Sequence, residues 1–444
     1  MFKKSILLLT AFLSLFSFSA CQKVNKPTTT KPEETSIIPT STRELTPEEK
    51  MDKFIDTMIE QTPEDVPAWN QENFKGKWNY IDGVFLKSII DKYNITNDEK
   101  YMDFVVNYVN YYIDEKGEFV NRKNSEYSGY TSSELDSICE SRILFDLLDY
   151  TNDSRYEVAI TRTYNELFRM KKCEGTNNFN HKSQYDNQIW LDGQYMYAPF
   201  ITRYAIKYED YTIFDMLKEQ YEYIRNHMFD TTKKLYYHAM DTTKKIFWSD
   251  PETGLSKSFW LRGMGWYFAS LADVLGYMDE ILDQKIESVI ACYTSLKNIY
   301  EEGITGILQY LDTKANMFYQ VVDRKGEGAL VSYDKYLQYL NPNYTEDTYI
   351  DNYLESSGSL LIAYSLLKVY NGNHERNKIG KDIFNGVYNH SFVNNSLNDI
   401  CITAGLGPFY NKYRDSSFEY YLAERVGSND AKGVGPFIMA YLAL

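Results

Sequence analysis

The chain has 444 residues and carries 62 Asp and Glu against 47 Lys and Arg, a formal net charge of −15. Its hydrophobic fraction of 43% can bury a large core, which excludes a chain that is disordered throughout. The acidic balance speaks against nucleic acid or an anionic membrane surface as a partner, because binding phosphates needs clustered Lys and Arg. Its 41 Tyr and 6 Trp suit stacking on flat, partly apolar ligands such as sugar rings, although a tyrosine-rich core would have the same composition.

The N-terminus has the pattern of an export signal. Lys3 and Lys4 precede an uncharged run over 6–20, which is shorter than the about 20 residues that a membrane-spanning helix needs. The FSAC sequence at 18–21 resembles a bacterial lipobox, with Phe18 where that pattern prefers Leu. The resemblance implies a signal peptide over 1–20, lipidation of Cys21 and a lipoprotein that faces the periplasm or the cell exterior. A plain secretory signal is the alternative.

The segment that follows lacks apolar periodicity and predicts a flexible tether rich in Thr, Pro and charge over 21–47. The body, 48–444, contains no second run of this apolar kind. Its four cysteines lie far apart and we expect buried free thiols: Cys139, Cys173, Cys292 and Cys401. The five histidines have no HxxxH or HExxH spacing, so we expect neither a metal site nor a cofactor.

The pattern of the body predicts a succession of helices. Apolar residues recur at helical spacing over 101–112, 214–228, 271–282 and 286–300. Only short pieces alternate, at 234–240 and 316–323, and these predict hairpin-sized insertions. The pattern predicts an all-α fold with one closed helical toroid. An α-solenoid is the competing architecture, but no fixed-period repeat is visible.

Two aspartates lie in apolar segments, where a hydrophobic core does not normally contain a carboxylate. Asp192 lies among apolar neighbours in NQIWLDGQYMYAPF at 187–200, and desolvation there suits a general acid. Asp136 precedes an apolar helical run, and near Asp192 it would form a carboxylate pair or hold substrate hydroxyls. Helix N-capping is the alternative for both residues.

The segment FWLRGMGWYF at 259–268 combines groups that suit an acidic sugar. Arg262 can fork onto a carboxylate, Trp260 and Trp266 can stack on a ring, and two glycines permit a close approach of the backbone. The alternative is a helix start with Arg262 in a surface salt bridge.

At this point the chain resembles a known family. WNYIDGV at 78, ELDSICESRILFDL at 134, HKSQYDNQIWLDGQYMYAPF at 181, LYYHAMD at 235 and three further segments at 248, 354 and 416 follow one another in the order of the unsaturated rhamnogalacturonyl hydrolases, glycoside hydrolase family 105. These enzymes are related to the unsaturated glucuronyl hydrolases of family 88. The resemblance covers most of the mature chain.

The resemblance implies a single (α/α)6 barrel whose inner helix ends form a pocket for a 4,5-unsaturated uronic acid at the non-reducing end of a lyase-generated oligosaccharide. It implies that Asp192 is the general acid and base and that Asp136 is the second carboxylate. The matching substrate contacts are Tyr80, His181, Trp190, His238, Arg262 and Trp266. The family usually has RGNGW where this chain has RGMGW, so Met264 replaces an amide, and LDSICESR replaces LDxINPGK.

The chemistry follows from the enol ether of such a substrate. Desolvation and the charge of Asp136 would keep Asp192 protonated at rest, so that Asp192 protonates C4 and then takes a proton from the water that attacks C5. Other readings are an unsaturated glucuronyl hydrolase for another acidic polysaccharide, an ordinary glycosidase on the same barrel, and a surface lipoprotein that only binds acidic glycans.

Overall fold

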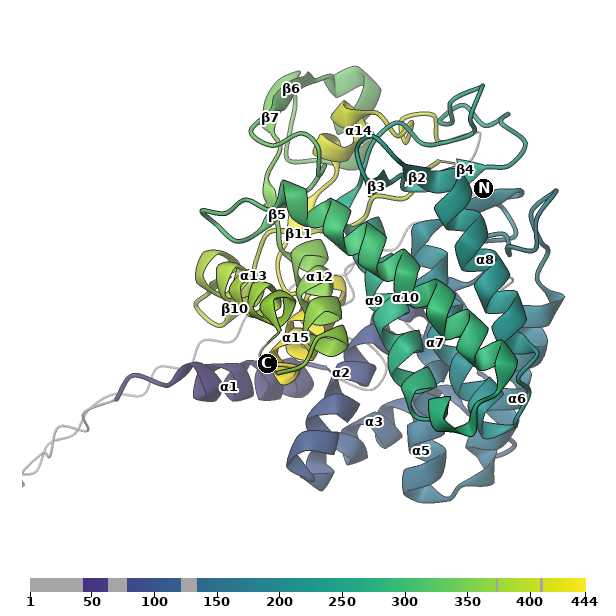
Figure 1. The fold of residues 1–444 in the computed structure, drawn as a ribbon. Coiled ribbons are helices and arrows are strands. Elements are labelled where there is room, and N and C mark those ends of the chain that lie inside the picture. The colour runs from purple at the N-terminus through teal and green to yellow at the C-terminus, as the bar shows by residue number, and fades with distance from the viewer. Residues whose placement is uncertain (1–42, 63–77, 121–133, 373, 408–409) are drawn as a thin grey trace, which may run out of the picture. The chain divides into compact units, whose positions relative to one another are not determined.

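The computed structural model describes residues 43–62, 78–120, 134–372, 374–407 and 410–444 (Figure 1). The expected signal peptide, Cys21 and most of the tether lie outside these residues and stay predictions. Residues from Thr46 to Leu444 form one unit. Helix α1 (Pro47–Glu60) begins where the tether was expected to end, with Thr46 and Glu49 in a reciprocal capping box.

The core of the unit is a closed ring of inner helices (Figure 1). Each inner helix packs on the next, and the last one returns to the first. In the described part of the chain the ring consists of α2 (Tyr80–Thr96), α4 (Asp136–Cys139) running on through η1 (Glu140–Ile143) and α5 (Leu144–Thr151), α7 (Leu191–Lys207), α9 (Leu261–Asp279), α12 (Ser356–Val369) and α15 (Ala431–Leu442). Most of these helices are buried on nearly every side, which explains why they show little amphipathic periodicity.

An outer layer of amphipathic helices covers the ring. It comprises α1, α3 (Glu99–Tyr112), α6 (Ser154–Arg169), α8 (Ile213–Met228), α10 (Glu287–Ile307) and α13 (Glu375–Ser391). The helices expected over 101–112, 214–228 and 286–300 are therefore confirmed. The fourth expected stretch is the second half of α9, and its last residue, Leu282, belongs instead to the short helix η2 (Leu282–Gln284).

Short antiparallel strand pairs join the loops, and β2 to β7 lie with α14 (Phe418–Ala423) at one end of the barrel, at the top of Figure 1. The pairs are β1 (Gln188–Trp190) with β4 (Ala239–Asp241), β2 (Phe229–Asp230) with β3 (Leu235–Tyr236), β5 (Phe318–Tyr319) with β8 (Leu354–Glu355), β6 (Gly328–Val331) with β7 (Thr348–Asp351), β9 (Phe392–Val393) with β10 (Ser396–Leu397), and β11 (Ile400–Cys401) with β12 (Val426–Gly427). The segment 316–323 does not make the local hairpin that we expected, because β5 pairs with the distant β8. The segment 234–240 is divided between β3 and β4, which pair with different partners.

The four cysteines of the body are buried free thiols, as expected. Across the described ranges, no helix has the length and apolar character needed to cross a membrane. The all-α fold with small strand insertions is confirmed as a closed toroid and not a solenoid, because α15 packs back on α2.

Candidate active site

The first turns of the inner helices carry the predicted site residues. Tyr80 opens α2, Asp136 opens α4, Asp192 is the second residue of α7 and Arg262 is the second residue of α9. The strand pair β1–β4 holds the entry to α7, with Trp190 opposite Ala239. Closing the ring brings these helix ends to one point.

There they enclose a pocket of about 200 Å³. All the predicted residues except His238 line this pocket. The lining is Tyr80, Asp136, His181, Lys182, Tyr185, Trp190, Asp192, Met196, Trp260, Arg262, Trp266, Thr403, Ala404, Gly405 and Arg414. The capping alternatives are wrong, because Leu135 and Trp190 occupy the N-cap positions and neither helix has a side-chain cap.

Asp136 is an ion-paired carboxylate. Its Oδ2 contacts Lys182 Nζ, and its Oδ1 lies 3.3 Å from His181 Nε2. Burial alone would raise the pKa of Asp136, but the charges and hydrogen bonds of Lys182 and His181 outweigh it and hold this pKa well below its usual range. Lys182 also lies 3.4 Å from Glu134 Oε2, and the two carboxylates raise the pKa of its ammonium group against burial. Asp136 is therefore an anion at neutral pH.

Aromatic rings form one wall of the pocket. The Trp190 ring stacks on His181 at 4.7 Å and 5°, and on Tyr185 at 5.0 Å and 11°. On another side Trp266 meets Tyr80 edge to face at 6.4 Å. Flat faces and edges at right angles to one another suit a ring-shaped ligand with apolar C–H surfaces.

Asp192 has a buried histidine behind it. His238 is fully buried, does not line the pocket, and places Nε2 3.4 Å from Asp192 Oδ2. Its Nδ1 lies 2.8 Å from the hydroxyl of Tyr421, which is also fully buried. Gly263 lies close to this pair, since a Cβ there would be in van der Waals contact with the His238 ring at 3.4 Å and tight against Trp260 at 3.2 Å. The role of His238 as a direct substrate contact stays a prediction.

The hydrogen bonds assign the tautomer of His238. Within the described residues, the hydroxyl of Tyr421 makes its hydrogen bond with His238 Nδ1, and a buried hydroxyl without another acceptor donates its proton there. Burial lowers the pKa of His238 against the opposing effect of Asp192, while His181 and Arg262 lower it further, so the imidazole is neutral. Its single proton then lies on Nε2 and faces Asp192.

Arg262 is not a surface residue, so the salt-bridge alternative is wrong. Its side chain is 2% exposed, donates to the Cys401 carbonyl and to Ser357 Oγ at 3.2 Å, and lies 5.0 Å above the Trp260 ring. Burial would lower the pKa of its guanidinium, but the surrounding Cys401, Glu355 and Tyr80 raise it. The pocket therefore has a fixed, permanently charged cation in its lining.

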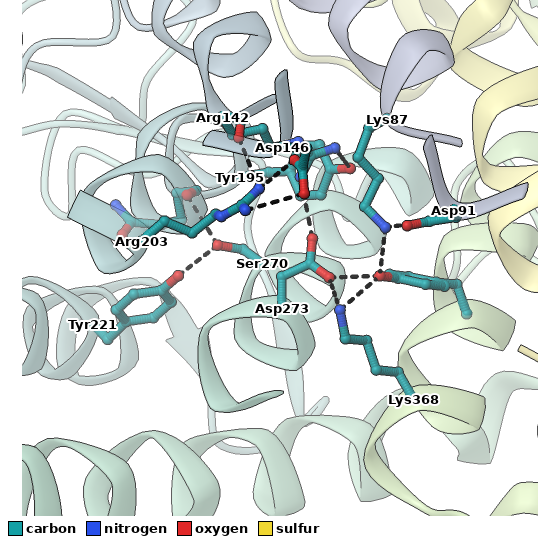
Figure 2. Close-up of polar contacts among 12 residues, drawn as sticks. Lys87, Asp91, Arg142, Asp146, Tyr195, Arg203, Tyr221, Ser270, Asp273 and Lys368 are labelled. Atoms are coloured by element: carbon teal, nitrogen blue, oxygen red, sulfur yellow. Dashed lines mark hydrogen bonds and ion pairs between the residues drawn. The ribbon is translucent and has the colours of Figure 1, made fainter. Parts of the chain in front are cut away.

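A buried polar network lies among the inner helices (Figure 2), and it is linked to the pocket through Trp266. Trp266 packs on Tyr195 at 4.6 Å, and the hydroxyl of Tyr195 accepts from Arg142. Arg142 in turn pairs with Asp273, whose Oδ2 lies 3.1 Å from the guanidinium. The other oxygen of Asp273 lies 2.6 Å from Lys368 Nζ. These charges anchor the position of Trp266.

Seven lining residues escaped the sequence reasoning, namely Lys182, Tyr185, Met196, Thr403, Ala404, Gly405 and Arg414. Lys182 and Tyr185 lie within the HKSQY segment that we used only for His181, so their segment was a usable signal. Arg414, paired with Glu424 at 3.3 Å, comes from a loop without a motif, and no local signal points to it. Met264, where the family usually has an amide, is fully buried and does not line the pocket, whereas Met196 does.

A sugar-sized pocket with two carboxyl groups, at the inner helix ends of a helical barrel, defines a glycoside hydrolase class of site. The family model described as Glycosyl Hydrolase Family 88 matches residues 50–332 and 341–444, and the chain belongs to this family. It is thus a glycoside hydrolase of the type formed by families 88 and 105, as the motifs indicated.

Solved structures agree. A family 105 glycoside hydrolase from C. acetobutylicum ATCC 824 is 30% identical with a TM-score of 0.72, over 89% of this chain and 99% of that chain. A possible family 105 member from Salmonella enterica serovar Paratyphi A is 13% identical with a TM-score of 0.66, over 93% and 99% of the two chains. The unsaturated glucuronyl hydrolase from Bacillus sp. GL1 shares the fold at 12% identity and a TM-score of 0.51, over 83% and 93%. The predicted (α/α)6 barrel is confirmed.

Proposed function

We propose that this enzyme removes a 4,5-unsaturated uronic acid from the non-reducing end of lyase-generated oligosaccharides, with rhamnogalacturonan fragments as its substrate. The observation that carries the proposal is a small pocket in which two carboxyl groups have different surroundings. Asp136 is paired with Lys182 and His181, whereas among the described residues the partner of Asp192 is the neutral His238 behind it. Family membership supports the proposal, as does the shared fold of a hydrolase named for unsaturated glucuronyl substrates.

The pocket favours an anionic sugar. Helices α2, α7 and α9 direct their N-termini at it, and the peptide dipoles give these ends a partial positive charge. Arg262 and Arg414 add full positive charges to the lining. A uronate carboxylate meets both sources of attraction.

The double bond of the substrate determines the mechanism. The C4=C5 enol ether is nucleophilic at C4, and Asp192 donates its proton there, which leaves an oxocarbenium ion at C5. Water adds to C5 and gives a proton to the Asp192 carboxylate, which restores the starting acid. The hemiketal at C5 then opens and expels the remaining oligosaccharide, so no nucleophile at C1 is needed.

Of the two tasks expected of Asp136, its surroundings favour holding substrate hydroxyls. Its charge is compensated by Lys182 and His181, so we assign it to accepting hydrogen bonds from substrate hydroxyls rather than to keeping Asp192 protonated. The N–H of His238 faces Asp192 Oδ2 and stabilises the carboxylate that forms after proton donation.

The test follows the enol ether absorbance of an unsaturated rhamnogalacturonan digest. Hydration erases this signal, and Asp192→Asn should lose at least ~10²-fold in turnover. The control is Asp186→Asn, a surface carboxylate that pairs with Lys171. Near-normal activity of Asp192→Asn would remove Asp192 from its role.

The other outcomes separate the alternatives. Turnover only of glucuronyl substrates would change the assigned uronic acid, and cleavage of saturated chains without an absorbance change would indicate an ordinary glycosidase. Tight binding without turnover of any substrate, unchanged in Asp192→Asn, would favour a glycan-binding protein.

A further inference from the structure

Besides residues 1–49, one internal segment of the chain stands outside the family match. Residues 333–340 fall between the two matched ranges and form η4 (Tyr333–Leu337) and α11 (Gln338–Leu340), in the connection from β6 to β7. This lobe lies at the strand-rich end of the barrel, at the top of Figure 1. This unmatched segment therefore lies at the end of the barrel where β2 to β7 gather.

The unmatched segment is bound to the loop that borders the pocket. Lys335 Nζ lies 2.9 Å from Asp415 Oδ2, and the Tyr336 hydroxyl donates to the same carboxylate at 3.1 Å. The hydroxyl of Tyr336 also lies 2.9 Å from Ser417 Oγ. Asp415 directly follows Arg414, which lines the pocket beside Gly405.

The unmatched segment presents a flat aromatic surface next to this loop. The Tyr339 ring stacks on the Tyr413 ring, with centroids 4.7 Å apart and 5° between their planes. Tyr339 is nevertheless 57% exposed, so the face turned away from Tyr413 meets solvent. Tyr413 is the chain neighbour of Arg414, so one ring of the pair belongs to the same loop as a residue that lines the pocket.

We propose that Tyr339, held by Tyr413, is a stacking platform for the leaving oligosaccharide. The sugar that stacks on it lies beyond the first two sugars of that oligosaccharide. The proposal rests on the proposed function. The pocket of about 200 Å³ takes the terminal uronic acid, and the rest of an oligosaccharide must leave over the rim. One face of a pyranose ring carries C–H groups and suits an exposed aromatic face. The stack with Tyr413 orders the platform beforehand, so little side-chain entropy is lost on binding.

The test compares substrates of different length. The measured quantity is the ratio of kcat/KM for an unsaturated tetrasaccharide to that for the unsaturated disaccharide from the same digest. Tyr339→Ala should lower this ratio about 3- to 10-fold, through KM of the tetrasaccharide. Tyr339→Phe keeps the ring and should keep the ratio.

Tyr349→Ala is the matched control. Tyr349 is a similarly exposed tyrosine, at 62%, and lies on β7 opposite Leu330. A platform at Tyr339 predicts that this variant has the wild-type ratio. Thermal unfolding of all variants shows whether any loss reflects the fold instead of the ring.

Each result decides something. An unchanged ratio in Tyr339→Ala, an equal loss for both substrates, or the same loss in Tyr349→Ala would overturn the platform. Turnover of the disaccharide without any length dependence in the wild type would refute the platform and leave the proposed function standing. No turnover of either substrate would refute both.

Discussion

Replacing Tyr421 by Phe removes the hydroxyl that orients His238 beneath Asp192. The native hydroxyl donates to Nδ1 and thereby keeps the imidazole proton on Nε2, which lies 3.4 Å from Asp192 Oδ2. In Tyr421→Phe the Nδ1 atom has no donor, so the proton can occupy either nitrogen. In the Nδ1–H tautomer a lone pair, not an N–H, faces the Asp192 carboxylate.

The size of the effect is bounded by the value of a full hydrogen bond, because the contact of His238 Nε2 with Asp192 Oδ2, at 3.4 Å, is longer than an ordinary one. A hydrogen bond to a charged group contributes about 1.5–3 kcal/mol, which corresponds to roughly 10- to 150-fold in rate. Because Tyr421→Phe leaves His238 in place and loses only the tautomer preference, we expect a fall in kcat near the lower limit, about 10-fold. KM should change little, because Tyr421 does not line the pocket.

The chain offers a direct assay, since it has only five histidines. Nitrogen-15 NMR of histidine-labelled enzyme distinguishes the two tautomers, and a His238→Gln variant assigns the signal. Tyr221→Phe is the matched control, because Tyr221 is also fully buried and has a hydrogen bond to Ser270 away from the pocket lining. An Nδ1–H tautomer or an imidazolium in the wild type at neutral pH would refute the reasoning, and so would equal losses of kcat in the two Phe variants.

Three further predictions concern charge and location. Lys182→Met removes the main counter-charge of Asp136, whose folded-state pKa lies below the unfolded value, so the pair stabilises the fold above about pH 3.9 and this contribution is lost as the pH falls. Urea unfolding at pH 7 should show a loss of about 3 kcal/mol that shrinks in acid, and a constant difference would contradict the pairing. Burial and the nearby charge of Asp82 raise the pKa of Glu140 well above its usual value. The protonated form of Glu140 therefore stabilises the fold, and this contribution is lost as the pH rises. Glu140→Gln should therefore gain in Tm over the wild type between pH 5 and pH 8, and a Tm difference that does not depend on pH would count against it. We also propose that the enzyme is exported and anchored through Cys21; Cys21→Ser should move it from the membrane fraction to the soluble fraction, and unchanged fractionation would refute the anchor.

Local pattern determined the outer layer of the barrel. Helices α3 and α8 each have one buried and one exposed face, so their apolar residues recur with the helical period and their bounds could be read closely. Helices α12 and α15 are buried nearly all round and show no such period. The strand β5 looked like half of a hairpin because alternation is a local signal, while its partner β8 comes from far along the chain.

The sequence by itself determined the two carboxylates, the arginine and a tryptophan of the pocket lining, because Asp136, Asp192, Arg262 and Trp266 belong to motifs at the starts of inner helices. Tertiary structure alone decided what each of them faces. Lys182 on Asp136, Tyr421 behind His238 across 183 residues, and Tyr339 on Tyr413 are contacts between separate loops. Such contacts arise only when the helical ring closes and brings its loops together at one end, and the local periodicity of a sequence carries no record of that closure.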